Sequence, residues 1–128
     1  MYETKAGLLA EVINHQGENE NKMKYAYANK KFTAAVVEMA SSPKTIQERV
    51  GDAFINHLMR LETEELPEEI RIKFGNMFQK LTICEPVGNK GTVQTTVDQM
   101  STDEGIELAK DIVHMADIVH SKCQGMGI

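Results

Sequence analysis

The sequence predicts an all-α fold, a single-domain bundle of five or six helices formed by residues 1–128. Two observations support this prediction. Helix-start motifs, in which a capping residue is followed by acidic residues, recur along the chain, and apolar residues recur between them at helical spacing. In addition, no segment of useful length alternates apolar and polar residues with the period of two that a strand requires.

Composition narrows the class of protein further. Of the 128 residues, 41% are hydrophobic and 26% are charged, which suits a globular domain and argues against a disordered or fibrous chain. No apolar run approaches the ~20 residues of a membrane span, so we expect no membrane partner. Two cysteines are too few for a disulfide scaffold, which favours a reducing, cytoplasmic location. The net charge of -5 argues against a nucleic-acid partner.

The N-terminal half is expected to form three helices. The first two span residues 4–15 and 19–41 and are separated by a break at Gly17, so that residues 1–17 are expected to form a peripheral N-terminal helix or arm. The third is expected at residues 44–62, where Ser42-Pro43 and a capping box from Thr45 to Glu48 offer two starts.

The C-terminal half is expected to form two longer helices and one short one. Pro67, followed by two glutamates, begins a helix over residues 67–82. After a glycine-containing loop, a shorter helix is expected near residues 91–100. Ser101-Thr102-Asp103-Glu104 is a capping box that begins the last helix, over residues 102–122, and Gly125 marks its end.

The 19–41 helix is apolar on two opposed faces. One face carries Met23, Tyr27, Ala34 and Val37. The other carries Tyr25, Phe32, Val36 and Met39. A helix of this kind needs cover on both sides. We therefore expect a homodimer, with Tyr25, Phe32, Val36 and Met39 as its interface. The alternative is that one face is covered within the chain by four apolar residues of the first helix: Leu8, Leu9, Val12 and Ile13.

The histidines are the main candidates for chemistry. His57 falls on the apolar stripe of its helix and is expected to be a buried, structural residue. His114, Asp117 and His120 suggest a metal site, but at helical geometry the two histidines diverge by about 120° and are about 9 Å apart along the axis. We therefore assign no catalytic residue, metal or cofactor. A small helical enzyme or metal protein that uses His57 or His114 with Asp117 remains an alternative.

The Lys22–Lys31 segment is the one basic, aromatic-bearing stretch. Residues 1–31 carry five lysines and four glutamates, whereas the rest of the chain carries nine basic and fifteen acidic residues. Solvated lysines around packed tyrosines account for the segment, and a nucleic-acid-associated regulator that uses it is an alternative. The leading interpretation is a non-enzymatic interaction or regulatory protein that self-associates through its N-terminal half, with another protein as a further candidate partner.

Overall fold

In the computed structural model, the backbone is described for residues 5–125 and the side chains for residues 23–125. These residues form five α-helices and no strand: α1 Lys5–Ser41, α2 Ile46–Ala53, α3 Arg71–Leu81, α4 Thr92–Asp98 and α5 Thr102–Cys123. A π-helical turn, η1 (Phe54–Leu58), continues α2, and two 3₁₀ turns, η2 (Thr63–Glu65) and η3 (Glu68–Ile70), lead into α3. The prediction of an all-α bundle is confirmed.

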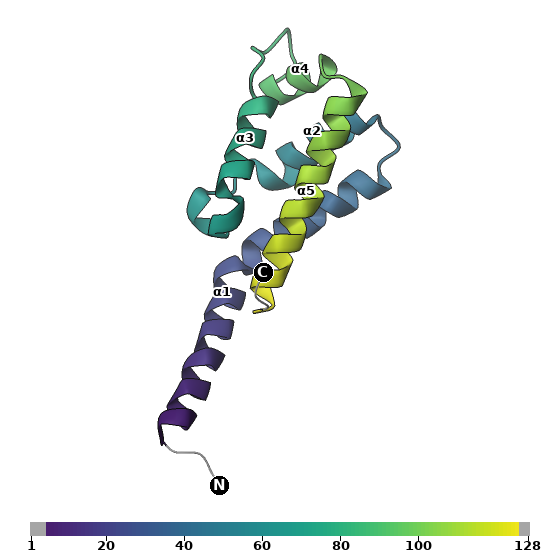
Figure 1. Cartoon of the computed structure of the whole chain (residues 1–128). Coiled ribbons are helices and arrows are strands. Elements are labelled where there is room, and N and C mark those ends of the chain that lie inside the picture. The colour runs from purple at the N-terminus through teal and green to yellow at the C-terminus, as the bar shows by residue number, and fades with distance from the viewer. Residues whose placement is uncertain (1–4, 126–128) are drawn as a thin grey trace.

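The long helices α1 and α5 form the most extensive pairing in the fold (Figure 1). Helix α2 packs against both of them, and α4 packs against α2 and α3. The C-terminal end of α3, helix α4 and the N-terminal end of α5 therefore meet at one end of the bundle, at the top of Figure 1.

Helix α1 runs without interruption from Lys5 to Ser41, so the predicted break at Gly17 is wrong. A single glycine costs a helix only about 1 kcal/mol relative to alanine, and it ends a helix only where the backbone adopts a capping conformation. A continuous helix has no turn at which its first part could fold back over residues 19–41. The side chains of the four residues proposed for that intramolecular cover lie outside the described residues.

Local capping chemistry sets the starts of α2 and α5. The Thr45 hydroxyl accepts a hydrogen bond from the Glu48 amide at 3.2 Å, so α2 begins here and not at Ser42-Pro43. At α5, the Ser101 hydroxyl accepts from the Glu104 amide at 3.1 Å, and the Glu104 carboxylate accepts from the Ser101 amide at 3.2 Å. The predicted capping box at α5 is therefore complete, whereas at α2 only the bond to the Thr45 hydroxyl forms and the Glu48 carboxylate accepts from that hydroxyl at 2.9 Å. Gly125, with φ of 77°, follows the end of α5 as predicted.

The core is aliphatic and lies between α1, α2, α3 and α5, with two aromatic pairs in edge-to-face contact. Phe32 and Phe74 have ring centroids 6.2 Å apart, and Phe54 and Phe78 have centroids 5.3 Å apart. A close approach of α2 and α4 depends on Gly51, where a Cβ atom would lie 3.1 Å from a methyl group of Val97. Close packing of this kind gives the bundle a rigid interior, which fixes the positions of the helices and of their exposed faces.

Candidate interaction surface

The four predicted interface residues lie on the covered face of α1. Tyr25, Phe32 and Met39 are buried, and Val36 is half-buried and packs against the core. Helix α5 is the main element that covers this face. These residues therefore leave water within one chain and are not available to an interface between copies.

The opposite face of α1 is open to solvent. Met23, Tyr27 and Val37 are 82%, 50% and 59% exposed, and Ala34 between them is half-buried. With the exposed Lys30, these residues follow the alternating steps of four and three that bring side chains into one seam along a helix. We call these five residues the outer face of α1. It is an apolar seam with one lysine in it.

Lysines lie directly against the tyrosines of this part of α1. The Lys24 ammonium is 5.4 Å from the centroid of the Tyr25 ring, and the Lys31 ammonium is 5.4 Å from the centroid of the Tyr27 ring. A cation over the face of an aromatic ring is attracted by the ring quadrupole, and this attraction is worth about 0.5–1 kcal/mol at exposed sites. The outer face therefore combines apolar surface with positive charge held close to it.

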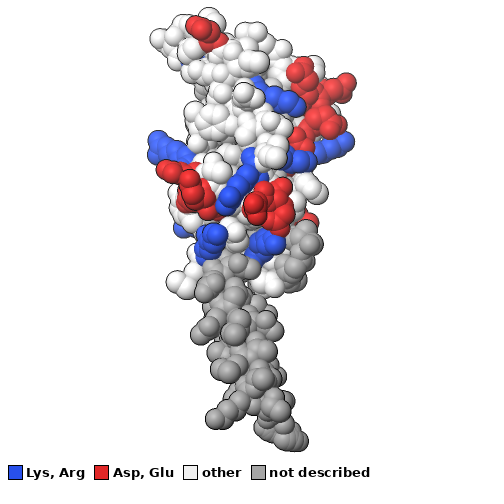
Figure 2. All heavy atoms as spheres, turned by 60° about the vertical axis from the view of Figure 1, so that its left-hand side comes forward, with Lys and Arg blue, Asp and Glu red and all other residues white. Residues whose placement is uncertain are grey.

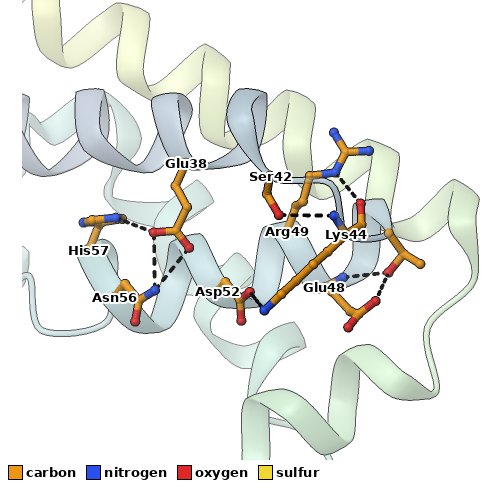
Figure 3. Close-up of polar contacts among 9 residues, drawn as sticks. Glu38, Ser42, Lys44, Glu48, Arg49, Asp52, Asn56 and His57 are labelled. Carbon is orange, nitrogen blue, oxygen red and sulfur yellow. Dashed lines mark hydrogen bonds and ion pairs between the residues drawn. The ribbon is translucent and has the colours of Figure 1, made fainter.

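A polar cluster lies at the C-terminal part of α1, where Glu38 meets the π-helical turn (Figure 3). The Glu38 carboxylate is 2.7 Å from His57 Nε2 and accepts hydrogen bonds from Asn56 Nδ2 at 3.1 and 3.3 Å. The wider π turn changes the register of the helix, so that His57 lies half-buried at the edge of the apolar stripe and not within it. The expectation that His57 is fully buried is wrong, and its contact with Glu38 ties η1 to α1.

The turn from α1 to α2 is held by charged side chains in the same view (Figure 3). Arg49 Nε donates to the Lys44 carbonyl at 2.8 Å, and its Nη1 donates to the Met39 carbonyl in the last turns of α1 at 3.3 Å. The Lys44 ammonium bonds to the Asp52 carboxylate at 2.8 Å, and this hydrogen bond raises the pKa of Lys44 above 10.5. These contacts satisfy helix-end carbonyls and fix the direction in which α1 leaves the bundle.

The predicted histidine motif of α5 is spread over exposed surface. His114, Asp117 and His120 are all exposed. The buried stripe of α5 consists of Leu108, Ile112, Met115, Val119 and Cys123. Within the part of the chain that the structure describes, no three His, Cys, Asp or Glu side chains gather closely enough to hold a metal ion.

A second surface feature is a cleft between α3, α4 and α5, which the sequence did not reveal. It encloses about 560 Å³ and has an apolar floor that includes Met100 and Leu108. Four carboxylates and one lysine also line it: Asp103, Glu104, Glu107, Asp111 and Lys80. We call this feature the acidic cleft. Its one signal in the sequence is the four-residue spacing of Asp103, Glu107 and Asp111, which places these acids on one side of α5.

The chain matches no protein-family model, no curated protein and no solved structure. Among the described helices, none combines the length and the apolar character needed to cross a membrane. The function is therefore inferred from the geometry of the surface.

Proposed function

We propose that this protein is a non-enzymatic helical interaction protein that associates with copies of itself through the outer face of α1, with a dimer as the smallest assembly. The observation that supports the proposal is the exposure of Met23, Tyr27 and Val37 along one side of a single helix. A reducing, cytoplasmic setting, as the two cysteines suggest, belongs to the same proposal.

The energetic reason is the cost of leaving these side chains in water. Full burial of a large apolar side chain is worth about 1.5–3 kcal/mol relative to exposure. Association costs free energy because each chain loses rotational and translational freedom. Partial burial of three such residues, together with neighbouring contacts, supplies enough free energy to favour association over this cost. Symmetric pairing of identical chains is the commonest way to cover a face of this kind.

The location of the face supports self-association through the N-terminal half, as the sequence analysis predicted. Tyr25 and Phe32 hold one side of α1 against the core, so the helix is fixed in rotation and presents its other side outward. The contacts of Arg49 and Glu38 with neighbouring elements hold the C-terminal end of α1 in place. A partner therefore meets a surface that is already ordered, which lowers the entropic cost of binding.

The test is the molar mass of the protein in solution, measured by sedimentation equilibrium over a range of concentrations up to tens of micromolar. We expect wild-type protein to associate, and we expect Tyr27→Glu to be monomeric while its far-ultraviolet circular dichroism is unchanged. Ile72→Glu is the matched control, because Ile72 is 81% exposed on α3, away from the outer face.

Two results would contradict the proposal. The first is a monomeric wild-type protein over the whole concentration range. The second is an Ile72→Glu variant that loses association as fully as Tyr27→Glu does, because the effect would then follow from added charge and not from the outer face of α1.

A further inference from the structure

The acidic cleft has the size and the floor of a binding site. Its volume of about 560 Å³ lies within the usual range of ligand pockets, ~300–1,000 Å³. Polar groups in its wall are already satisfied within the chain. The Thr96 hydroxyl accepts from the Cys84 amide at 3.2 Å and donates to the Thr92 carbonyl at 2.8 Å. The groups left to meet a ligand are therefore the apolar floor, the carboxylates and the Lys80 ammonium, so that acidic groups outnumber basic ones.

The carboxylates of the cleft repel one another. Asp103, Glu107 and Asp111 follow at steps of four along α5, and each like-charged pair at this spacing destabilises a helix by about 0.2–0.5 kcal/mol. The helix dipole favours Asp103 in the first turn, but its effect does not reach the other two. Figure 2 shows acidic side chains gathered at the upper right, toward this end of the bundle, whereas acidic and basic side chains alternate lower down.

The cations near these acids offset little of this repulsion. Asp111 is 3.5 Å from the Lys73 ammonium and Glu107 is 3.4 Å from the Lys110 ammonium, both in exposed pairs of the kind that contribute about 0–1 kcal/mol. Among the described residues, Asp103 has no ion-pair partner. The cleft thus favours an occupant that carries both apolar side chains and positive charges.

The α1 segment around Tyr27 has this chemistry. Met23 and Tyr27 are exposed and are separated by one helical turn, about 6 Å along the axis of α1. Asp103 and Glu107 are separated by the same distance along the axis of α5. Lys24 and Lys30 are exposed on the same segment. Apolar surface with adjacent ammonium groups therefore complements an apolar floor with adjacent carboxylates.

The segment cannot reach the cleft of its own chain. Helix α1 pairs with α5, and its segment around Tyr25 lies beside the C-terminal end of α5 (Figure 1). The α5 residues that line the cleft lie nearer its N-terminal end, roughly 16–28 Å from Lys122 at the 1.5 Å rise of a helix. Figure 1 shows α4, which also contributes to the cleft, beside the N-terminal end of α5. An α1 segment in the cleft must come from a second copy.

We propose that the acidic cleft of one copy binds the N-terminal part of the outer face of α1 from a second copy, Met23, Tyr27 and Lys30, together with the flanking Lys24. Met23 and Tyr27 face the apolar floor, and Lys24 and Lys30 face the carboxylates. This inference rests on the proposed self-association, because it names the surface that the outer face meets. The contact joins two unlike surfaces, so two copies that exchange both contacts form a closed dimer.

Mixing two complementary variants tests this contact. The α1 variant is Lys24→Glu with Lys30→Glu, and the cleft variant is Asp103→Lys with Glu107→Lys. Each variant alone is expected to lose association, with a dissociation constant raised about tenfold or more. An equimolar mixture is expected to form a 1:1 complex, seen by native mass spectrometry, because one chain then brings an intact α1 and the other an intact cleft.

The controls separate this inference from the proposed function. Glu64→Lys with Glu68→Lys makes the same charge change on exposed residues outside the cleft and should leave association unchanged. If circular dichroism shows that the cleft variant unfolds, the milder Asp103→Asn with Glu107→Gln replaces it, with a smaller rise in the dissociation constant expected. A monomeric wild-type protein would refute the proposed function itself.

Two other outcomes would overturn the inference while the proposed self-association stands. In the first, wild-type protein associates and the folded cleft variant associates equally well, so the cleft is not part of the contact. In the second, both variants lose association and their mixture forms no complex, which would show that α1 of one copy does not contact the cleft of the other.

Discussion

Replacing Phe32 with alanine tests which face of α1 belongs to the core. The Phe32 side chain is 0% exposed and packs edge-to-face on Phe74 with a centroid distance of 6.2 Å. Truncation of a buried phenylalanine costs about 3–5 kcal/mol, because apolar contacts are lost and the cavity that remains collapses only in part. A domain of this size has a free energy of unfolding of about 5–15 kcal/mol, so Phe32→Ala should remove a large part of it.

The measurement is urea unfolding followed by circular dichroism at 222 nm, at a protein concentration low enough to keep the chains monomeric. With a slope of about 1–3 kcal/mol per molar urea, a loss of this size lowers the unfolding midpoint by more than about 1 M. Tyr27→Ala is the matched control on the opposite face of the same helix. It should change the free energy of unfolding by no more than about 1 kcal/mol, because its ring is half exposed, bounds no core cavity and loses only an exposed contact with Lys31.

The reasoning fails if Phe32→Ala costs less than about 1 kcal/mol, since a buried phenylalanine cannot be removed so cheaply. It also fails if Tyr27→Ala is the more damaging of the two. Phe32→Glu should unfold the bundle and not yield folded monomers, because it places a charge in the core.

Three further predictions follow from individual contacts. Gly51→Ala should lower the urea midpoint of unfolding, because its new methyl group meets α4 at a cost of about 1–3 kcal/mol. Gly75→Ala, whose methyl group would meet nothing within 4 Å, should raise the free energy of unfolding by about 0.5–1 kcal/mol. Stabilisation by both changes would contradict the packing of α2 against α4. His57→Ala should cost roughly 1–2 kcal/mol in urea unfolding, through loss of its 2.7 Å contact to the α1 carboxylate, and an unchanged midpoint would show that the contact is not structural. Hydrogen bonding from Lys122 lowers the pKa of Glu69 below 4.5, so Glu69→Gln should cost about 0.2–1 kcal/mol near pH 7. The difference in free energy of unfolding between the two proteins should vanish as the pH falls through the lowered pKa, because protonated Glu69 is neutral like glutamine. A difference that persists at pH 2 would exclude this ion pair as its cause.

Local signals allowed the helices to be predicted from the sequence. Ser101 and Glu104 accept hydrogen bonds from each other's backbone amides, and the Thr45 hydroxyl accepts from the Glu48 amide in the first turn of α2. These starts therefore depend on residues three positions apart. Such interactions are nearly independent of the rest of the fold. Gly17 was misread as a break for the same reason, because a glycine ends a helix only with a particular backbone conformation that composition does not specify.

The surfaces could not be predicted in this way. The sequence showed that α1 is apolar on two sides, but the choice of Phe32 for the core and Tyr27 for the solvent depended on which side α5 covers. The acidic cleft has walls from three helices, and its carboxylates alone resembled ordinary helix-start acids. Periodicity gives the faces of each helix one at a time, whereas burial and clefts arise from contacts between residues far apart in the chain, so only the tertiary structure decides them.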